Sequence, residues 1–269
     1  MGLVDYLPPP LARPTVTHAN CTVAEIQGFR PLHLDLHVPP GEGPFPVVLW
    51  IHGGGWQSGS RLWLPDSIAP YAFHERLIAR GYAVADVDYR LASEAQYPAQ
   101  LTDVQSAIRW LRHHAGSLQL DPQRFATLGE SAGGHLAAMA ALLGEGETAI
   151  QAMVNWYGAA DLDFRDSDDP FTSPAVLLGG PIRGRRDFAR WASPINHVHP
   201  GAPPFLNMHG TEDEIVPIEQ SIRLTEALQA HGCRADLYPV EGAGHCFVGY
   251  ADIGGLIEAS ADFLDDVLK

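Results

Sequence analysis

Apolar side chains follow two patterns along the chain: short dense runs, and longer stretches in which they recur every three or four residues. Two early runs, 22–28 ("TVAEIQG") and 31–39 ("PLHLDLHVP"), alternate apolar and polar residues, which predicts two half-exposed strands joined by a turn near Gly28. Later runs are richer in β-branched and aromatic residues, as buried strands are. These runs lie at 45–53, 82–89, 124–131, 152–158, 204–210 and 235–242. The pattern therefore predicts eight strands.

Helical periodicity separates most of the later strands. The apolar side chains in 99–116 that share one helical face, at spacings of three and four, are Leu101, Val104, Ile108 and Leu111. Similar stretches lie at 71–81, 131–144, 218–232 and 255–268. An antiparallel start followed by strands alternating with helices is typical of a mostly parallel sheet covered by helices on both faces. We therefore predict one α/β domain over residues 1–269.

Residues 161–204 depart from this alternation. The segment is rich in Pro, Gly and charges of both signs, and it is too long for a simple connection. We expect it to form a lid or cap inserted into the domain. Four of its arginines could meet an acidic substrate, although charges on such a segment more often form a solvated face: Arg183, Arg185, Arg186 and Arg190.

The formal net charge of −15 argues against nucleic acid as a partner, because phosphate binding needs a basic face. No run reaches the roughly 18 to 20 apolar residues of a membrane-spanning helix. The opening "MGLVDYLPPPLARP" lacks the basic and apolar regions of a signal peptide. Cys21, Cys233 and Cys246 are too few and too widely spaced for a disulfide framework, which fits a reducing compartment. We expect a cytoplasmic monomer or homodimer that binds a small molecule and neither nucleic acid nor membrane.

A nucleophile motif stands between a predicted strand and a predicted helix. The sequence "GESAGG" matches G-x-S-x-G, with Ser131 flanked by Gly129 and Gly133. A serine on such a sharp turn presents its hydroxyl above the sheet, and flanking glycines avoid a clash of Cβ atoms. The alternative is a purely structural glycine-rich turn with a helix-capping serine. The strand-turn-helix context favours the nucleophile.

A serine hydroxyl needs a histidine to accept its proton and a carboxylate to hold that histidine. In this arrangement the chain order is serine, acid, histidine. The acid could come from "HGTEDEIVP", which offers Glu212, Asp213 and Glu214, and spacing alone does not choose among them. His245 follows on the loop "EGAGHCF". Both loops follow predicted strands, where α/β sheets place their sites.

The glycines of "HGGGW", residues 52–56, follow the third predicted strand. Backbone N–H donors stabilise the oxyanion of acyl transfer, and glycines let the backbone approach it closely. We therefore predict an oxyanion hole formed by the amides of Gly54, Gly55 and Ala132. No metal or cofactor is expected. The pair His197 and His199 could in principle bind a metal, but it has no cysteine or carboxylate partner in its motif.

Together, "HGGGW", "DYRLASE", "GESAGGHLA", "HGTEDEIVP" and "GAGH" resemble the α/β-hydrolase esterases of the hormone-sensitive-lipase-like group, over about residues 30–265. "HGGGW" and "YPAQLTDVQSAIRWLR" are more similar to the small acetyl-xylan and feruloyl esterase-like branch. The resemblance implies Ser131 as nucleophile, His245 as base and Asp213 as acid. The chain departs from the group at Glu130, where Asp is frequent, and at Ser93, where the motif usually has Pro.

Three further residues have two readings each. Trp56 could line the substrate pocket or only pack under the oxyanion loop, and Glu130 could orient the site or make a buried structural hydrogen bond. Cys246 could sense oxidation, although a half-buried inert thiol is more common. We retain Trp56 and Glu130 as substrate-binding candidates.

The expected function is hydrolysis of small or short-acyl esters by a serine carboxylesterase through an acyl-enzyme. An arylformamidase-like amide hydrolase has the same triad, although such enzymes usually carry a larger residue at the position of Gly55. A hydrolase-fold protein that binds a ligand without catalysis is a third possibility, which the presence of all the catalytic residues disfavours.

Overall fold

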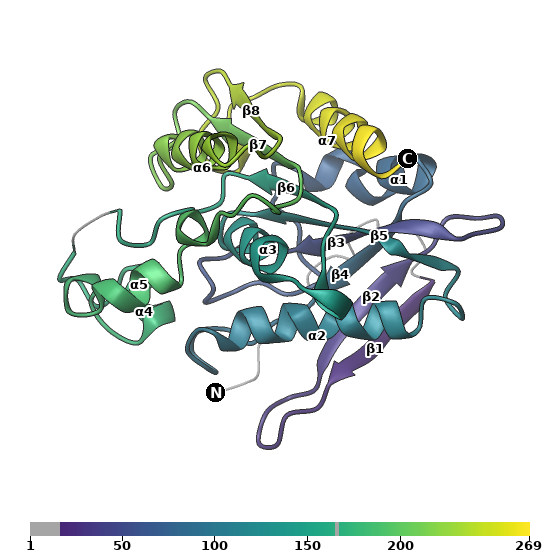
Figure 1. Ribbon diagram of the computed structural model, residues 1–269, viewed down its shortest axis with the longest axis horizontal. Helices are drawn as coiled ribbons and strands as arrows, with labels where there is room; N and C mark the ends of the chain where they lie inside the picture. The colour runs from purple at the N-terminus through teal and green to yellow at the C-terminus, as the bar shows by residue number, and fades with distance from the viewer. Residues whose placement is uncertain (1–16, 165–166) are drawn as a thin grey trace, which may run out of the picture.

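The computed structural model describes residues 17–164 and 167–269, in which eight strands form one sheet in the order β1-β2-β4-β3-β5-β6-β7-β8. The first pairings, β1 with β2 and β2 with β4, are antiparallel, and all later pairings are parallel (Figure 1). The strands are β1 (His18–Ala24), β2 (Leu32–His37), β3 (Phe45–Ile51), β4 (Ala83–Val87), β5 (Leu120–Glu130), β6 (Ala152–Trp156), β7 (Phe205–Gly210) and β8 (Ala235–Val240). This confirms the predicted α/β-hydrolase architecture.

The first strand begins at residue 18, four residues before the predicted start at residue 22, so the predicted bounds of this strand were wrong. Residues beyond Ala24 turn instead, with Phe29 N–H donating to the Ile26 carbonyl and Gly28 at φ +84°. Glycine adopts this backbone conformation without a Cβ penalty, so the chain reverses there. The signal-peptide prediction concerns residues 1–14, which lie outside the described residues.

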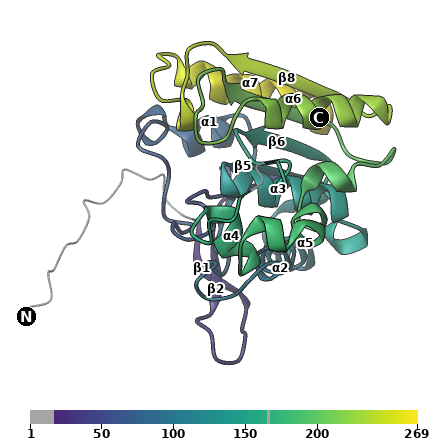
Figure 2. The same ribbon diagram turned by 90° about the vertical axis from the view of Figure 1, so that its left-hand side faces the viewer.

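Helices cover both faces of the sheet. On one face α2 (Ala99–His113), α3 (Ala132–Leu143) and α6 (Glu219–Ala230) share one buried apolar cluster with Val47, Leu49 and Ile51 of β3, and α6 packs on β7 and β8. On the other, α1 (Phe73–Ala79) and α7 (Ile253–Leu268) contact each other (Figure 2) and share a second buried cluster with Val48 and Trp50. Strand β3, "FPVVLWI", is buried on both faces, which explains why it reads as a continuous apolar run. Among the described residues, no helix is both long and apolar enough to cross a bilayer.

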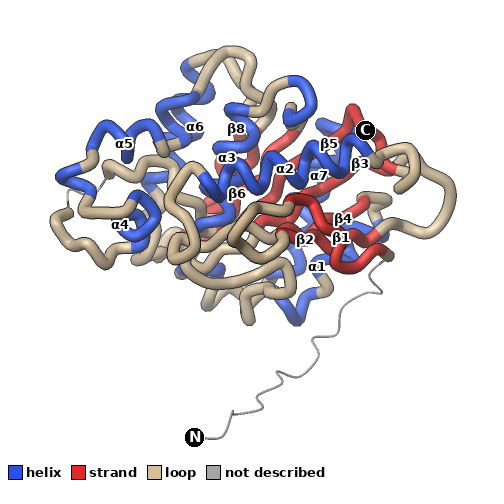
Figure 3. Tube along the Cα trace, turned by 90° about the horizontal axis from the view of Figure 1, so that it is seen from below, coloured by secondary structure: helices blue, strands red, loops and turns tan. Residues whose placement is uncertain are grey.

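The segment 161–204 runs between β6 and β7. It contains α4 (Ser173–Leu178) and α5 (Arg186–Trp191), which lie at one end of the molecule (Figure 1, Figure 3). Leu177, Leu178 and Ala189 are fully buried in the same core as α2 and α3. A hydrogen bond also joins His135 Nε2 on α3 to the Ala192 carbonyl at 2.7 Å. The segment is therefore packed against the domain.

Candidate active site

Ser131 occupies a strained turn between β5 and α3. Its backbone has φ 52° and ψ −118°, a conformation that side-chain-bearing residues rarely adopt. The turn is this tight because two glycines let backbones meet: a Cβ on Gly133 would lie 1.9 Å from the Ile51 carbonyl oxygen, and one on Gly129 would lie 2.3 Å from the Gly133 oxygen. Residues with side chains at these positions would push the strand away from the helix. The two glycines thus allow the tight turn that places Ser131 at the carboxyl end of the sheet.

His245 connects Ser131 to Asp213. Ser131 Oγ lies 3.0 Å from His245 Nε2, and His245 Nδ1 lies 2.7 Å from Asp213 Oδ2. These distances allow the hydroxyl to donate to Nε2 while Nδ1–H donates to the carboxylate. The ring of Tyr157 packs edge-on against His245 at 5.0 Å between centroids. This is the geometry of a nucleophile, a base and an orienting acid.

Of the three acidic candidates, the structure brings Asp213 to His245, while Glu212 and Glu214 are exposed. Asp213 Oδ1 accepts the amide hydrogens of Ile215 and Val216, both at 2.9 Å. Burial alone raises the pKa of Asp213, but hydrogen bonds from His209 and His245 outweigh it and hold that pKa well below its usual range. The carboxylate therefore stays ionised at neutral pH.

The glycine loop places free amides beside Ser131. Gly54 and Gly55 both have positive φ, +96° and +62°. Across residues 17–164 and 167–269, neither of their amides donates to a protein group. Ala132 is the first residue of α3, where backbone amides have no partner within the helix. All three predicted oxyanion residues line one cavity with Ser131.

Glu130 holds the glycine loop from behind. Gly53 N–H donates to Glu130 Oε1 at 2.6 Å, and the Glu130 side chain is almost completely buried. A Cβ on Gly53 would lie 2.1 Å from that oxygen, so only glycine permits the contact. Burial, offset in part by the Gly53 hydrogen bond, raises the pKa of Glu130 to about 7. Glu130 thus makes the buried structural hydrogen bond that was one of its two predicted roles, and the residue also borders the cavity.

We expect Glu130→Gln to gain stability relative to the wild type as pH rises from 4.5 to 8. A carboxyl whose pKa is raised on folding stabilises the folded state at low pH and loses that contribution as pH passes from about 4.5 to about 7. The glutamine keeps an acceptor for Gly53 without a charge, so the variant should gain about 3 kcal/mol over this range. Urea unfolding at both pH values measures the difference. Exposed Glu214→Gln is the control, and equal behaviour of the two variants would contradict the prediction.

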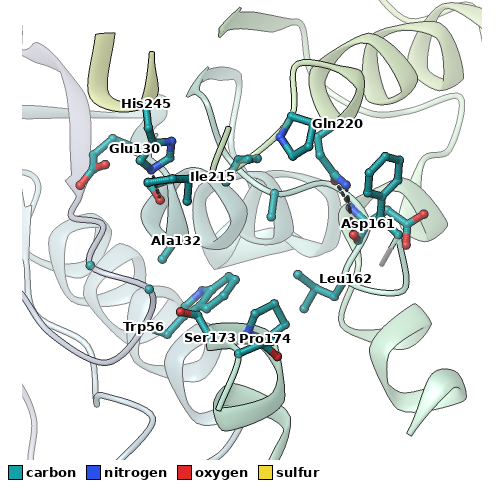
Figure 4. Close-up of a pocket in the computed structure, with 18 of the residues that line it drawn as sticks. Trp56, Glu130, Ala132, Asp161, Leu162, Ser173, Pro174, Ile215, Gln220 and His245 are labelled. Carbon is teal, nitrogen blue, oxygen red and sulfur yellow. Dashed lines mark hydrogen bonds between the residues drawn. The ribbon is translucent and has the colours of Figure 1, made fainter. Parts of the chain in front are cut away.

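The cavity beside Ser131 has a volume of about 790 Å³. Its walls come from the glycine loop, the triad loops and the 161–204 segment, and Figure 4 draws many of them. The lining residues are Gly54, Gly55, Trp56, Trp63, Glu130, Ser131, Ala132, Ala159, Asp161, Leu162, Phe164, Ser167, Thr172, Ser173, Pro174, Ile182, Ile215, Val216, Pro217, Gln220, His245 and Cys246. A pocket of this size and mostly apolar lining suits a small molecule.

Trp56 both lines the cavity and packs. Its indole meets the His135 ring edge-on at 5.1 Å between centroids, and its carbonyl accepts the Ala92 amide at 2.7 Å. Cys246 also borders the cavity, where burial and the Glu130 carboxylate raise the pKa of its thiol to about 12. A protonated thiol is a poor nucleophile, so the inert reading of Cys246 is favoured.

The remaining candidates lie away from the triad. His197 and His199 bond to different main-chain carbonyls, those of Trp191 and Leu142. Three of the four candidate arginines pair locally, Arg183 with Asp168 and both Arg186 and Arg190 with Asp163. These contacts fit a solvated face better than an acidic-substrate site.

One cluster was not predicted: His37 on β2, His74 on α1 and Asp86 on β4 converge in the core. His37 Nε2 lies 3.1 Å from Asp86 Oδ2, and His74 Nε2 lies 2.9 Å from both carboxylate oxygens. The three ligand atoms are close enough to hold a metal ion, but two imidazole N–H groups already satisfy the carboxylate. The three residues stand on separate elements, so no spacing in the sequence connects them.

The chain resembles known proteins over most of its length. A family model described as BD-FAE matches residues 34–228. Esterase LipC of Mycobacterium tuberculosis is 35% identical over 83% of this chain and 59% of its own length. A truncated carbohydrate esterase from gut microbiota has a TM-score of 0.81, with 27% identity over 93% of this chain and 95% of that one. Thermogutta terrifontis esterase 2, with propionate bound, has a TM-score of 0.75 at 29% identity over 94% of this chain and 96% of its own.

The chain spans 59% of LipC and 55% of the related esterase LipQ. The matched region 34–228 contains the glycine loop, the nucleophile turn and Asp213, while His245 follows it. The chain therefore belongs to the BD-FAE family, among the hormone-sensitive-lipase-like α/β-hydrolases.

Proposed function

We propose that this protein is a serine carboxylesterase that hydrolyses small or short-chain acyl esters. The observation that carries the proposal is the hydrogen-bonded chain from Ser131 through His245 to Asp213. It opens on a cavity bordered by backbone amides that donate to no group in the described part of the chain. LipC and the Thermogutta enzyme are both named esterases, which supports it. A second structure of Thermogutta terrifontis esterase 2, phosphorylated by paraoxon, adds support because this class of reagent modifies nucleophilic serines.

The proposed reaction has two halves. Ser131 attacks the ester carbonyl while His245 Nε2 takes its proton, and the amides of Gly54, Gly55 and Ala132 hold the oxyanion. His245 then gives the proton to the leaving alcohol, which leaves an acyl-enzyme. Water, deprotonated by His245, releases the acid and restores the serine. Asp213 keeps Nδ1 of His245 protonated throughout.

The positions of the catalytic groups indicate which half of the cavity would hold the leaving alcohol and which the acyl group. The leaving alcohol must lie beside His245, because that ring protonates it. Figure 4 shows Ile215 near His245, with Trp56, Pro174 and Leu162 across from them beyond Ala132. We propose that the acyl group extends toward Trp56 and that the 161–204 segment acts as a cap closing this half. Trp56 then limits acyl length.

The test is a series of p-nitrophenyl esters from acetate to dodecanoate. We expect the highest kcat/KM at the shortest acyl groups. Trp56→Ala is expected to move the optimum to longer chains, because removing an indole opens the proposed acyl half. Tyr71→Ala, which removes a half-buried aromatic residue that does not line the cavity, is the control. A wild-type optimum at dodecanoate would overturn the short-chain assignment.

Two outcomes would point to other functions. Turnover of N-formylkynurenine but not of a matched ester would favour an amide hydrolase. Failure of a fluorophosphonate probe to label Ser131 would favour a non-catalytic binding protein.

We further propose that this chain folds as one domain and works in a reducing cytoplasm as a monomer or homodimer, with no nucleic-acid or membrane partner. The state of Cys21, Cys233 and Cys246, all free thiols, supports the reducing compartment. Sedimentation of the purified protein at several concentrations distinguishes the two assembly states.

A further inference from the structure

A second histidine, His209 at the end of β7, contacts the same carboxylate oxygen as His245. His209 Nε2 lies 3.3 Å from Asp213 Oδ2 and 2.7 Å from the Val216 carbonyl oxygen. His209 is fully buried. The mechanism proposed above gives this residue no role.

Two acceptors at Nε2 fix which ring nitrogen of His209 carries hydrogen, and the hydroxyl of Ser221 on α6 supplies the donor that the other nitrogen needs. Both groups facing Nε2 are acceptors, so Nε2 must be protonated. In the neutral ring Nδ1 is then an acceptor, and Ser221 Oγ, 2.7 Å away, donates to it. Ser221 is itself fully buried, so no bulk water replaces this donor.

The His209 N–H closes the turn that carries Asp213. The turn already directs the Ile215 and Val216 amides to Oδ1. His209 adds a bond to the Val216 carbonyl and a longer contact to Oδ2, the oxygen that accepts from His245. Asp213 is thus fixed on both oxygens, and only the His245 contact leads to Ser131.

We propose that His209, held at Nδ1 by the Ser221 hydroxyl, is a positioning residue for the acid of the triad. It fixes the 213–216 turn so that Oδ2 faces His245 Nδ1. This inference rests on the proposed function, because it assigns His209 a role in the same serine hydrolysis. If Ser221 loses its hydroxyl, the buried Nδ1 has no donor and the ring loses the bond that fixes its orientation, so Nε2–H no longer holds the Val216 carbonyl and Asp213 Oδ2 in place.

The primary variant is Ser221→Ala. We expect kcat to fall about 10-fold with KM within twofold, because a small misplacement of a catalytic group carries a rate cost of this order. Ser221→Thr keeps the hydroxyl and should restore the wild-type rate. Ser221→Cys, with a weak donor of similar size, should lie between them and replaces the alanine variant if that one does not fold.

Ser260→Ala is the matched control. Ser260 is an equally buried serine hydroxyl, but it lies on α7 and bonds to Trp156 Nε1, the Leu256 carbonyl and Met208 Sδ rather than to His209 or the 213–216 turn. We expect it to leave kcat unchanged. An equal fall in both variants, or a Ser221→Ala rate within twofold of wild type, would overturn the proposal.

A pH profile adds a readout that general destabilisation does not move. In Ser221→Ala the acidic limb of kcat/KM should shift to lower pH, because a displaced Asp213 stabilises the protonated His245 ring less. The other titratable groups near His245 are Glu130, Cys246 and Tyr157, which the variant leaves in place. An unshifted limb in Ser221→Ala contradicts the inference.

The rate of fluorophosphonate labelling at Ser131 separates this inference from the proposed function. If wild type is labelled but hydrolyses no ester, the esterase assignment fails, whereas a roughly 10-fold slower labelling of Ser221→Ala still supports the role of His209. If wild type is not labelled, the triad does not activate Ser131 and both fail.

Discussion

Replacing Ser131 with alanine is expected to lower kcat by about 10⁴- to 10⁶-fold while the protein stays folded. In the proposed reaction this hydroxyl forms the covalent bond to the acyl carbon, and its hydrogen bond within the described chain is to His245. The backbone strain at this turn should be the same for alanine as for serine, because both residues carry a Cβ. Initial rates on p-nitrophenyl acetate, with the melting temperature of each protein, measure both parts of this expectation.

Combined variants test whether the triad acts as a unit. Adding His245→Ala to Ser131→Ala should cost almost nothing further, since each residue works through the other. Asp213→Asn should also lower kcat, by about 10⁴-fold, because the amide favours the wrong tautomer of His245. Additive losses in the double variant would contradict a shared mechanism, and residual turnover above about 1% in Ser131→Ala would remove Ser131 from its role.

Replacing Asp86 with alanine is expected to have the largest effect on stability, a loss of about 3 kcal/mol that lowers the melting temperature by roughly 6 to 12 °C. Asp86 is fully buried and accepts hydrogen bonds from His37 and His74. Without the carboxylate, two imidazole N–H groups remain in the core with no acceptor. Asp252→Ala removes an exposed N-cap of α7 and should cost only about 1 kcal/mol.

The effect of Asp86 should depend on pH in a defined direction. Burial raises the pKa of Asp86, but His74 and His37 outweigh it and lower that pKa to about 2. An acid whose pKa is lowered on folding stabilises the folded protein above about pH 4, and this contribution is lost as the pH falls toward about 2. The stability difference between wild type and Asp86→Ala should therefore shrink by about 2 kcal/mol over that range. A difference that stays constant would show that the carboxylate charge does not matter.

Local patterns predicted the fold and the residues that meet in the candidate site. Strand β3 and helix α2 follow from a dense apolar run and a periodic one. Ser131 follows from its glycine-flanked turn. Asp213, by contrast, needed the family resemblance, because burial alone separates it from the exposed Glu212 and Glu214, and burial depends on how the turn folds.

Other features could not be predicted because they depend on tertiary contacts. His209 belongs to the "HGTEDEIVP" motif, but its hydrogen bond to Ser221 on the following helix does not follow from that motif. The bond from Gly53 to Glu130 joins residues 77 positions apart. The predicted end of β1 at residue 28 was wrong because alternation continues through a segment that turns back at Gly28, where φ is +84°.

The 161–204 segment separates the residues that anchor it from those that face the cavity. Leu177, Leu178 and Ala189 bury it in the core, whereas Ser173 and Pro174 border the cavity and lie outside that core. New substrate preferences can therefore arise by substitution at the cavity-facing positions without loss of folding or of the triad. A directed-evolution library restricted to those positions would keep most of its members folded, and its active members would differ in the esters they select.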